Sequence, residues 1–300
     1  MPISVFAGVA PLCPSFDALI RDVWGVLMDG VESYPEALPC LARLRAAGKR
    51  VVLLSNAPRR ESLVEARLAS IGIASTHYDR IVSSGEATRA ALERRLLPAI
   101  AGLGRRYFFL GPDRDLGLLA GLDYRRVEAV DQADFVLDVG TFEDFDAIER
   151  FDDLLARARA RALPLICANP DHEIVRRGGE RLLCAGAIAA RYQAQGGQAI
   201  YFGKPHPAIY GTCFEALAAI DPAIAPARVL ALGDNLETDI AGAKRAGLRT
   251  GLVLGGVLAD ELARVGARPV PGVAPKAEAV ERVCAAHGVF PDLAIPAFSW

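Results

Sequence analysis

Short apolar runs that alternate with stretches of helical periodicity constrain the fold of this chain more than any other feature. Residues 49–56 (KRVVLLSN) form a continuous apolar run, which is typical of a strand buried on both faces of a parallel sheet. The preceding residues 35–48 place Leu38, Leu41 and Leu44 at helical spacing and end at Gly48. This repeated alternation predicts an α/β fold built on a doubly wound parallel sheet.

The same alternation returns after about residue 200, where residues 198–204, 227–234 and 248–256 are predicted strands. The intervening stretch has strands and helices of its own, with predicted strands at residues 105–111, 133–140 and 163–170. We therefore expect a discontinuous core domain of residues 1–85 and 201–300. A second α/β domain is expected as an insertion at residues 86–200.

Composition narrows the class of protein. Apolar residues make up 52% of the 300 residues and charged residues 23%, and the formal net charge is -2. This balance predicts a sizeable core and no nucleic-acid partner. The six cysteines are irregularly spaced, which favours reduced thiols, and no apolar run is long enough to span a membrane. The first 20 residues hold no basic residue, so a signal peptide is not expected and the predicted location is cytoplasmic.

Four predicted strands of the core end in polar residues. These are Asp22, then Ser55 with Asn56, then Lys204, then Asp234. In an open parallel sheet, ligands bind at the carboxyl ends of the strands, so we expect these side chains to meet. Two carboxylates suit a hard cation such as Mg²⁺, and a hydroxyl, an amide and an ammonium suit phosphate oxygens. The set predicts phosphoryl chemistry.

Four segments resemble, in order, the four motifs of the haloacid dehalogenase-like hydrolases: DVWGVL (22–27), LLSNAPR (53–59), GKPHP (203–207) and GDNLETDIAGAKRAG (233–247). The resemblance spans about residues 17–256 and is strongest to class IIA, the NagD-like phosphatases. In that branch an α/β cap of the C2 type lies between the second and third motifs, as the predicted insertion does here. The fourth motif is specific, and the four together are a strong signature.

The resemblance implies a role for each matching residue. Asp22 would be the nucleophile, Ser55 and Asn56 would bind the transferring phosphoryl group, and Lys204 would neutralise it. Mg²⁺ would be held by Asp22, the backbone carbonyl of Trp24 and Asp234, with Asp239 holding the surrounding shell or Lys204.

Trp24 departs from the family pattern. Most members have a second Asp there, which protonates the leaving oxygen, and an indole cannot exchange a proton near neutral pH. General acid–base catalysis is typically worth about 10²–10⁴-fold, so we expect activity that is reduced or restricted to activated leaving groups. Asp29 and His206 are two candidate substitutes, and neither is favoured by its spacing alone.

The insertion offers candidate substrate contacts. Asn169, Asp171 and His172 lie in the segment ANPDHE, and Arg176, with Arg177 and Arg181, follows in RRGGER. These side chains either read the substrate or are solvated surface groups, and the sequence leaves both open. A homodimer through the cap is a further possibility.

The sequence therefore predicts a Mg²⁺-dependent phosphatase acting on a small phosphorylated metabolite through an aspartyl-phosphate. Two alternatives remain. One is a phosphate-binding or regulatory protein of the same fold that has lost turnover. Trp24 favours this alternative, and the presence of Asp22 argues against it. The other is a phosphotransferase that uses the same intermediate.

Overall fold

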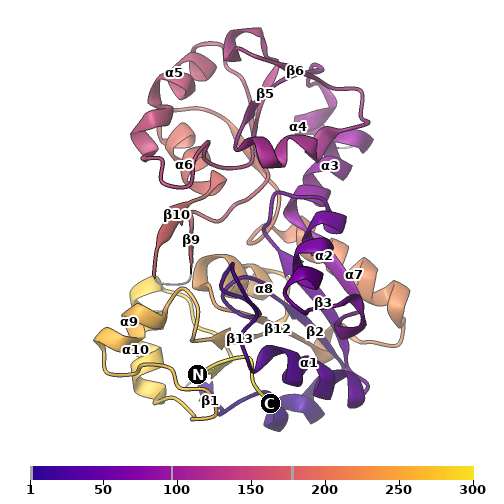
Figure 1. The fold of residues 1–300 in the computed structure, drawn as a ribbon, viewed down its shortest axis with the longest axis vertical. Coiled ribbons are helices and arrows are strands. Elements are labelled where there is room, and N and C mark those ends of the chain that lie inside the picture. The colour runs from indigo at the N-terminus through magenta and orange to yellow at the C-terminus, as the bar shows by residue number, and fades with distance from the viewer. Residues whose placement is uncertain (1–2, 96, 177–178) are drawn as a thin grey trace.

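A computed structural model describes residues 3–95, 97–176 and 179–300 and shows two lobes, each built around a parallel sheet (Figure 1). The lower lobe contains a seven-stranded sheet in the order β1-β14-β13-β12-β2-β3-β4, and all neighbouring strands in it are parallel. Its strands are β1 (Ser4–Val5), β2 (Ala18–Arg21), β3 (Arg50–Ser55), β4 (Arg80–Ser83), β12 (Val229–Gly233), β13 (Arg249–Val253) and β14 (Leu293–Ile295).

Helices cover both faces of this sheet. The helices of the lower lobe are α1 (Ala37–Ala46), α2 (Glu61–Ser70), α7 (Pro207–Ile220), α8 (Ala241–Arg245), α9 (Ala259–Arg264) and α10 (Ala277–His287). Alternate residues of β3 enter different cores: Val51 and Leu53 pack with α1 and α2, whereas Val52 and Leu54 pack with α7 and α8. This burial on both faces explains the continuous apolar run and confirms the doubly wound α/β fold.

The upper lobe is a second parallel sheet with the strand order β11-β8-β7-β5-β6. Its strands are β5 (Arg106–Leu110), β6 (Arg125–Val127), β7 (Phe135–Asp138), β8 (Leu165–Cys167) and β11 (Ala199–Tyr201). The helices of this part of the chain are α3 (Ser84–Arg94), α4 (Pro98–Ala101), α5 (Asp152–Ala160) and α6 (Ala185–Ala194). An antiparallel hairpin of β9 (Glu173–Val175) and β10 (Arg181–Leu183) extends from this lobe toward the core (Figure 1).

The strand before Lys204 lies in a different sheet from the one predicted. We expected residues 198–204 to form a core strand, but β11 pairs with β8 of the upper sheet. Lys204 therefore stands on the connection that returns from the upper lobe to the core. The prediction was wrong because a short apolar strand carries no local signal of the sheet it joins.

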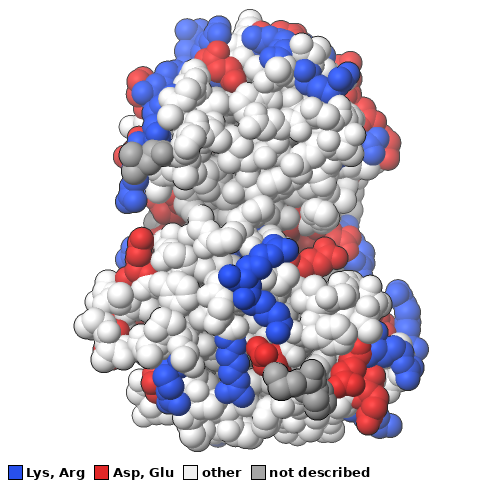
Figure 2. Space-filling view, turned by 180° about the vertical axis from the view of Figure 1, so that it is seen from behind, with Lys and Arg blue, Asp and Glu red and all other residues white. Residues whose placement is uncertain are grey.

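A narrow waist separates the two lobes in the space-filling view, and both signs of charge are interspersed on the face shown (Figure 2). No helix among the described residues is long and apolar enough to cross a membrane.

Candidate active site

Three neighbouring strands of the core sheet deliver polar side chains to one edge. β2 lies between β12 and β3, at the point where the order of connections reverses. Asp22 follows β2, Asp234 follows β12, and Ser55 ends β3. In doubly wound sheets this reversal opens a crevice at the carboxyl ends of the strands, and the structure brings these predicted residues together there.

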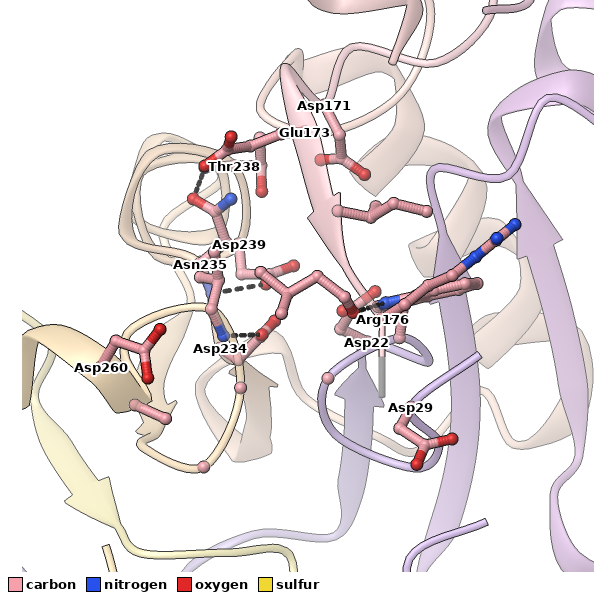
Figure 3. A pocket seen from close by; sticks show the side chains of 18 of the residues that line it. Asp22, Asp29, Asp171, Glu173, Arg176, Asp234, Asn235, Thr238, Asp239 and Asp260 are labelled. Carbon is pink, nitrogen blue, oxygen red and sulfur yellow. Dashed lines mark hydrogen bonds between the residues drawn. The ribbon is translucent and has the colours of Figure 1, made fainter. Parts of the chain in front are cut away.

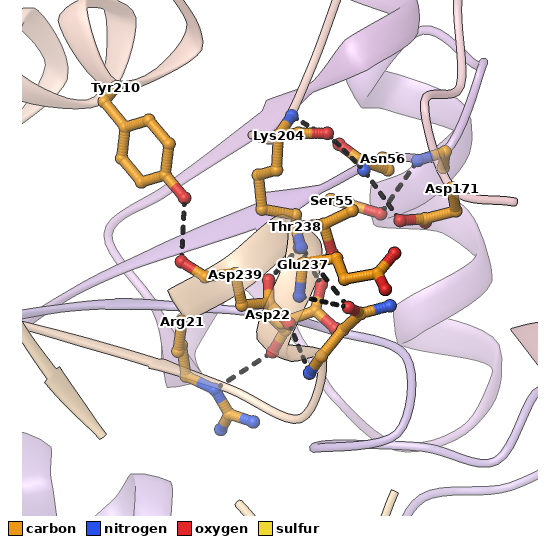
Figure 4. Close-up of polar contacts among 12 residues, drawn as sticks. Arg21, Asp22, Ser55, Asn56, Asp171, Lys204, Tyr210, Glu237, Thr238 and Asp239 are labelled. Atoms are coloured by element: carbon orange, nitrogen blue, oxygen red, sulfur yellow. Dashed lines mark hydrogen bonds and ion pairs between the residues drawn. The ribbon is translucent and has the colours of Figure 1, made fainter. Parts of the chain in front are cut away.

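Lys204 reaches the same edge from the connecting segment. Its Nζ donates to Oδ1 of Asp22 at 2.6 Å and to Oδ1 of Asp239 at 2.6 Å (Figure 4). Lys204 is 3% exposed, so both ion pairs are shielded from water. The Tyr210 hydroxyl donates to the backbone carbonyl of Asp239 at 3.2 Å, a contact without a sequence signal. A single buried ammonium thus joins two buried carboxylates.

Three carboxylates could hold a cation. Ligand atoms of Asp22, Asp234 and Asp239 all lie within 4.8 Å of one another, and all three residues are buried. Two glycines leave room around Asp234: a Cβ would lie 2.1 Å from its Oδ2 at Gly25 and 1.8 Å from it at Gly256. Hard oxygen ligands in a tight group fit Mg²⁺ or Ca²⁺.

The electrostatics of this group point the same way. Burial, reinforced by the neighbouring Asp239 and opposed by Lys204, raises the pKa of Asp22 to about 7. Burial and the facing carboxylates of Asp22 and Asp239 hold the pKa of Asp234 well above its usual value. Burial alone would lower the pKa of Lys204, but the surrounding carboxylates raise it well above its usual value. Lys204 carries one positive charge, against three negative charges if all three carboxylates are ionised. A bound dication would supply the two positive charges that are missing.

Asn56 is tied to protein groups on both sides of its amide. Its Oδ1 accepts from the backbone N–H of Lys204 at 2.8 Å, and its Nδ2 donates to Oδ1 of Asp171 at 2.9 Å and to the Lys204 carbonyl at 3.1 Å. Ser55 is buried, and its Oγ accepts from the backbone N–H of Ala57 at 3.2 Å. The Asn56 side chain therefore links the end of β3 to the backbone of Lys204 and to Asp171 of the upper lobe.

Two cavities lie between the lobes and meet at Asp22. One, of about 260 Å³, is lined by Asp22, Asp234, Asp239 and Lys204. Figure 3 shows the three carboxylates around this cavity. The other, of about 380 Å³, is lined by Ser55 and Asn56 and by apolar side chains from both lobes. Residues after β5, β7 and β8 line this larger cavity, so the carboxyl ends of both sheets face it. The residues that line both cavities are Asp22, Trp24, Asp171, Ile174 and Arg176.

The two candidate substitutes for the missing acid lie in different places. Asp29 lines the smaller cavity, and its Oδ1 accepts from the backbone N–H groups of Val31 and Glu32 at 2.9 Å each. His206 stacks on Tyr201, with ring centroids 5.1 Å apart, and among the described residues it is not part of the lining of either cavity. Partial burial and Arg245 lower the pKa of His206. This position does not favour His206 as the proton donor.

Some candidate residues of the insertion line the cavities, and others do not. Asp171 and Arg176 line both cavities, and Asn169 lines the larger one. Burial raises the pKa of Asp171, and the nearby Lys204 opposes that rise. His172 is exposed and is not among the described lining residues. Arg176 pairs with Asp144 at 2.8 Å, which favours a structural role for its charge.

The two remaining arginines of the predicted cluster do not extend the site. Arg181 forms an ion pair with Glu173 across the β9–β10 hairpin. Arg177 lies outside the described residues.

An ion pair between the lobes was missed from the sequence. Arg59 Nε lies 2.5 Å from Oδ1 of Asp115, whose side chain is 4% exposed, and both residues line the larger cavity. Arg59 belongs to the segment LLSNAPR, so its position was a signal. Asp115 has no motif that could have revealed it.

Comparison with known proteins places the chain in a family. The family model "Haloacid dehalogenase-like hydrolase" matches residues 19–125, and the model "HAD-hydrolase-like" matches residues 201–280. Human chronophin is 33% identical over 248 residues, covering 80% of this chain and 81% of chronophin. A haloacid dehalogenase-like hydrolase from Brucella suis 1330 superimposes with a TM-score of 0.80 at 33% identity, over 99% of both chains.

Two further solved structures share the fold. The glycerol phosphate phosphatase Rv1692 of Mycobacterium tuberculosis, in complex with magnesium, is 27% identical with a TM-score of 0.61, over 87% of this chain and 74% of that one. NagD from Escherichia coli K-12 has a TM-score of 0.64 at 23% identity, over 95% and 98% of the two chains, which shows likeness of fold. The chain therefore belongs to the haloacid dehalogenase-like hydrolases, in their NagD-like branch.

Proposed function

We propose that this protein is a Mg²⁺-dependent phosphatase that hydrolyses a small phosphorylated metabolite through an aspartyl-phosphate on Asp22. The observation that carries the proposal is the pairing of buried Asp22 with Lys204, 2.6 Å away, beside Asp234 and Asp239. A carboxylate aimed at a phosphate repels it unless the two react. A protein that only bound phosphate would use Asp22 at most as a cation ligand and as the partner of Lys204, whereas a nucleophilic catalyst requires its carboxylate.

The residues support a two-step displacement. A carboxylate oxygen of Asp22 attacks the phosphorus, the bond to the leaving oxygen breaks, and an acyl phosphate forms. Water then attacks that phosphorus, and the bond from phosphorus to the Asp22 oxygen breaks. The protons of the water leave with the released inorganic phosphate, and the Asp22 carboxylate is restored. Lys204 stays protonated throughout and offsets the charge that the phosphoryl group brings to Asp22.

Mg²⁺ fits the oxygen donors of Asp22 and Asp234, with Asp239 beside them, and would supply charge neutralisation for the phosphoryl oxygens. The phosphatase Rv1692, a relative of the same fold, was solved with magnesium and also with calcium, which supports a divalent cation at this site.

Trp24 sets the range of leaving groups. Its indole cannot give a proton to the leaving oxygen, so groups that depart as stable anions are favoured over alkoxides. Aryl, acyl and anhydride phosphates meet this requirement.

The test is the hydrolysis of p-nitrophenyl phosphate with Mg²⁺ by the wild type, Asp22→Asn and Asp123→Asn. The matched control removes a carboxylate whose side chain is 91% exposed. We expect turnover in the wild type and in the control, and none in Asp22→Asn, whose cooperative thermal unfolding would show that the variant is folded. Full activity in Asp22→Asn would refute the proposal.

The same assay separates the two alternatives. A binding protein would release no nitrophenol from any activated phosphate, although it would bind inorganic phosphate. A phosphotransferase would release nitrophenol in excess of inorganic phosphate when a small alcohol acceptor is added. The proposed phosphatase releases the two products in equal amounts.

A further inference from the structure

Trp24 makes a direct hydrogen bond from the core to the hairpin of the upper lobe. Its indole Nε1–H donates to the backbone carbonyl of Val175 at 2.8 Å, across 151 positions of sequence. Val175 ends β9, and the neighbouring Glu173, Ile174 and Arg176 line the smaller cavity with it. Figure 3 shows Glu173 and Arg176 around the same pocket as Asp22. The hydrogen bond thus holds this hairpin where it covers the nucleophile.

The core provides a dedicated seat for the indole. A Cβ at Gly30 would lie 2.3 Å from Cη2 and 2.4 Å from Cζ2 of Trp24, so only glycine admits the ring in this position. Gly30 has a φ of +90°, and the adjacent Asp29 accepts two backbone N–H groups that close the turn. The Asp29–Gly30 pair therefore shapes the surface on which the ring lies.

The location of the ring gives this contact a consequence for the substrate. Trp24 follows Asp22 by two residues and lines both cavities. A phosphoryl group at Asp22 lies among the carboxylates and Lys204, so its leaving group must extend past the indole into the larger cavity. Apolar side chains from both lobes line part of that cavity, among them Val31, Leu63 and Leu182. Charged side chains, including Arg59, Arg114 and Asp144, line the rest.

We propose that Trp24 is a specificity-determining residue that fastens the β9–β10 hairpin over the phosphoryl group and selects apolar leaving groups for the larger cavity. The selection of leaving groups rests on the proposed phosphatase function. The closure of the hairpin by Trp24 does not depend on that function. An acid at this position would donate a proton to the leaving group. Trp24 instead holds the hairpin closed over the phosphoryl group. A phosphate ester of an apolar aryl group fits this arrangement better than one of a polyol.

The test combines hydrogen exchange of residues 173–176 and 179–183 with kinetics for Trp24→Phe, which keeps an aromatic ring and removes the N–H. One neutral hydrogen bond is worth roughly a 2–10-fold change in an equilibrium. We expect the amides of the hairpin to exchange about 2–10-fold faster and KM for p-nitrophenyl phosphate to rise by a similar factor, with kcat changing less. Trp300→Phe is the matched control, because Trp300 packs against the core of the lower lobe, and it should leave both quantities unchanged.

A second variant guards against an unfolded Trp24→Phe. In Gly30→Ala the added Cβ would clash with the Trp24 ring and displace it. This variant should therefore also speed exchange in the hairpin. Unchanged hairpin exchange in either folded variant would overturn the inference. Asp22→Asn separates the two proposals: it should keep a protected hairpin while turnover is lost, so failure of catalysis and failure of closure give different results.

Discussion

The Asn56 side chain donates from Nδ2 to Oδ1 of Asp171 at 2.9 Å and thereby joins the end of β3 to the upper lobe. Its Oδ1 accepts the backbone N–H of Lys204 at 2.8 Å. One amide thus fixes the relative position of a core strand, the upper lobe and the lysine that pairs with Asp22.

Asn56→Ala should lower both stability and turnover. The Lys204 N–H and the Asp171 carboxylate would lose their partner in a buried site, which costs about 1–3 kcal/mol. We expect a lower melting temperature and a lower kcat/KM. Asp171→Asn should cost less, because it keeps an acceptor for Nδ2. In a double-mutant cycle the two sites should couple, and strictly additive effects of Asn56→Ala and Asp171→Ala would show that the contact carries no energy.

Lys204→Met should abolish turnover and destabilise the protein in a way that Mg²⁺ partly corrects. The change leaves Asp22 and Asp239 buried without their cation, and breaking a buried pair costs about 3–5 kcal/mol. The melting temperature should fall without metal and recover in part when Mg²⁺ is added. Lys244→Met, at a side chain that is 40% exposed, is the control. Equal melting temperatures for the two variants would contradict the ion pairs described here.

Trp24→Asp should change the preference among leaving groups. A carboxyl at this position can protonate a leaving alkoxide, whose departure gains most from a general acid. We expect the ratio of kcat for an alkyl phosphate to kcat for p-nitrophenyl phosphate to rise, up to about 10²-fold, while KM rises because the bond to Val175 is lost. An unchanged ratio in a folded variant that still binds Mg²⁺ would mean that another group already supplies the proton.

Asp138→Asn should stabilise the protein increasingly as pH rises. Asp138 is fully buried, and its Oδ2 has no hydrogen-bond partner among the described residues. Burial holds its pKa well above the ordinary 3.8, so above pH 4 the unfolded chain releases this proton while the folded chain keeps it. Wild-type stability therefore falls with rising pH through this group, and asparagine removes that loss.

Melting temperatures at pH 5 and pH 8 check this expectation. The difference between Asp138→Asn and the wild type should be larger at pH 8. The exposed variant Asp123→Asn should show no such trend. A difference that shrinks with rising pH would contradict a raised pKa for Asp138.

Local patterns in the sequence predicted the sheet and the ends of its strands. Asp22, Ser55 and Asp234 were found because a buried parallel strand is an apolar run, and the next polar residue marks its end. Lys204 was also predicted as the end of a strand, although that strand belongs to the upper sheet, and the resemblance to a family added Asp239. Contacts between distant segments had no such signal, and the bond from Trp24 to Val175 spans 151 positions.

Other features depend on pairing that a single chain segment does not encode. β11 looks like any short apolar strand, and only its partner β8 assigns it to the upper lobe. The strand β14 lies in a tail rich in Pro, where periodicity is weak. The sequence does not show why residue 30 is a glycine. The structure does, because the ring of Trp24 occupies the space that a Cβ at this position would need.

The central claim is that Asp22 carries the phosphoryl group during turnover. The most direct measurement is an acid quench in the first turnover of an aryl phosphate labelled in its phosphoryl group, with Mg²⁺ present, followed by peptide mapping. We predict the label on the peptide that contains Asp22 in the wild type, and its absence from Asp22→Asn. Nitrophenol release by a wild-type enzyme that carries no label, or carries it on another residue, would contradict the account.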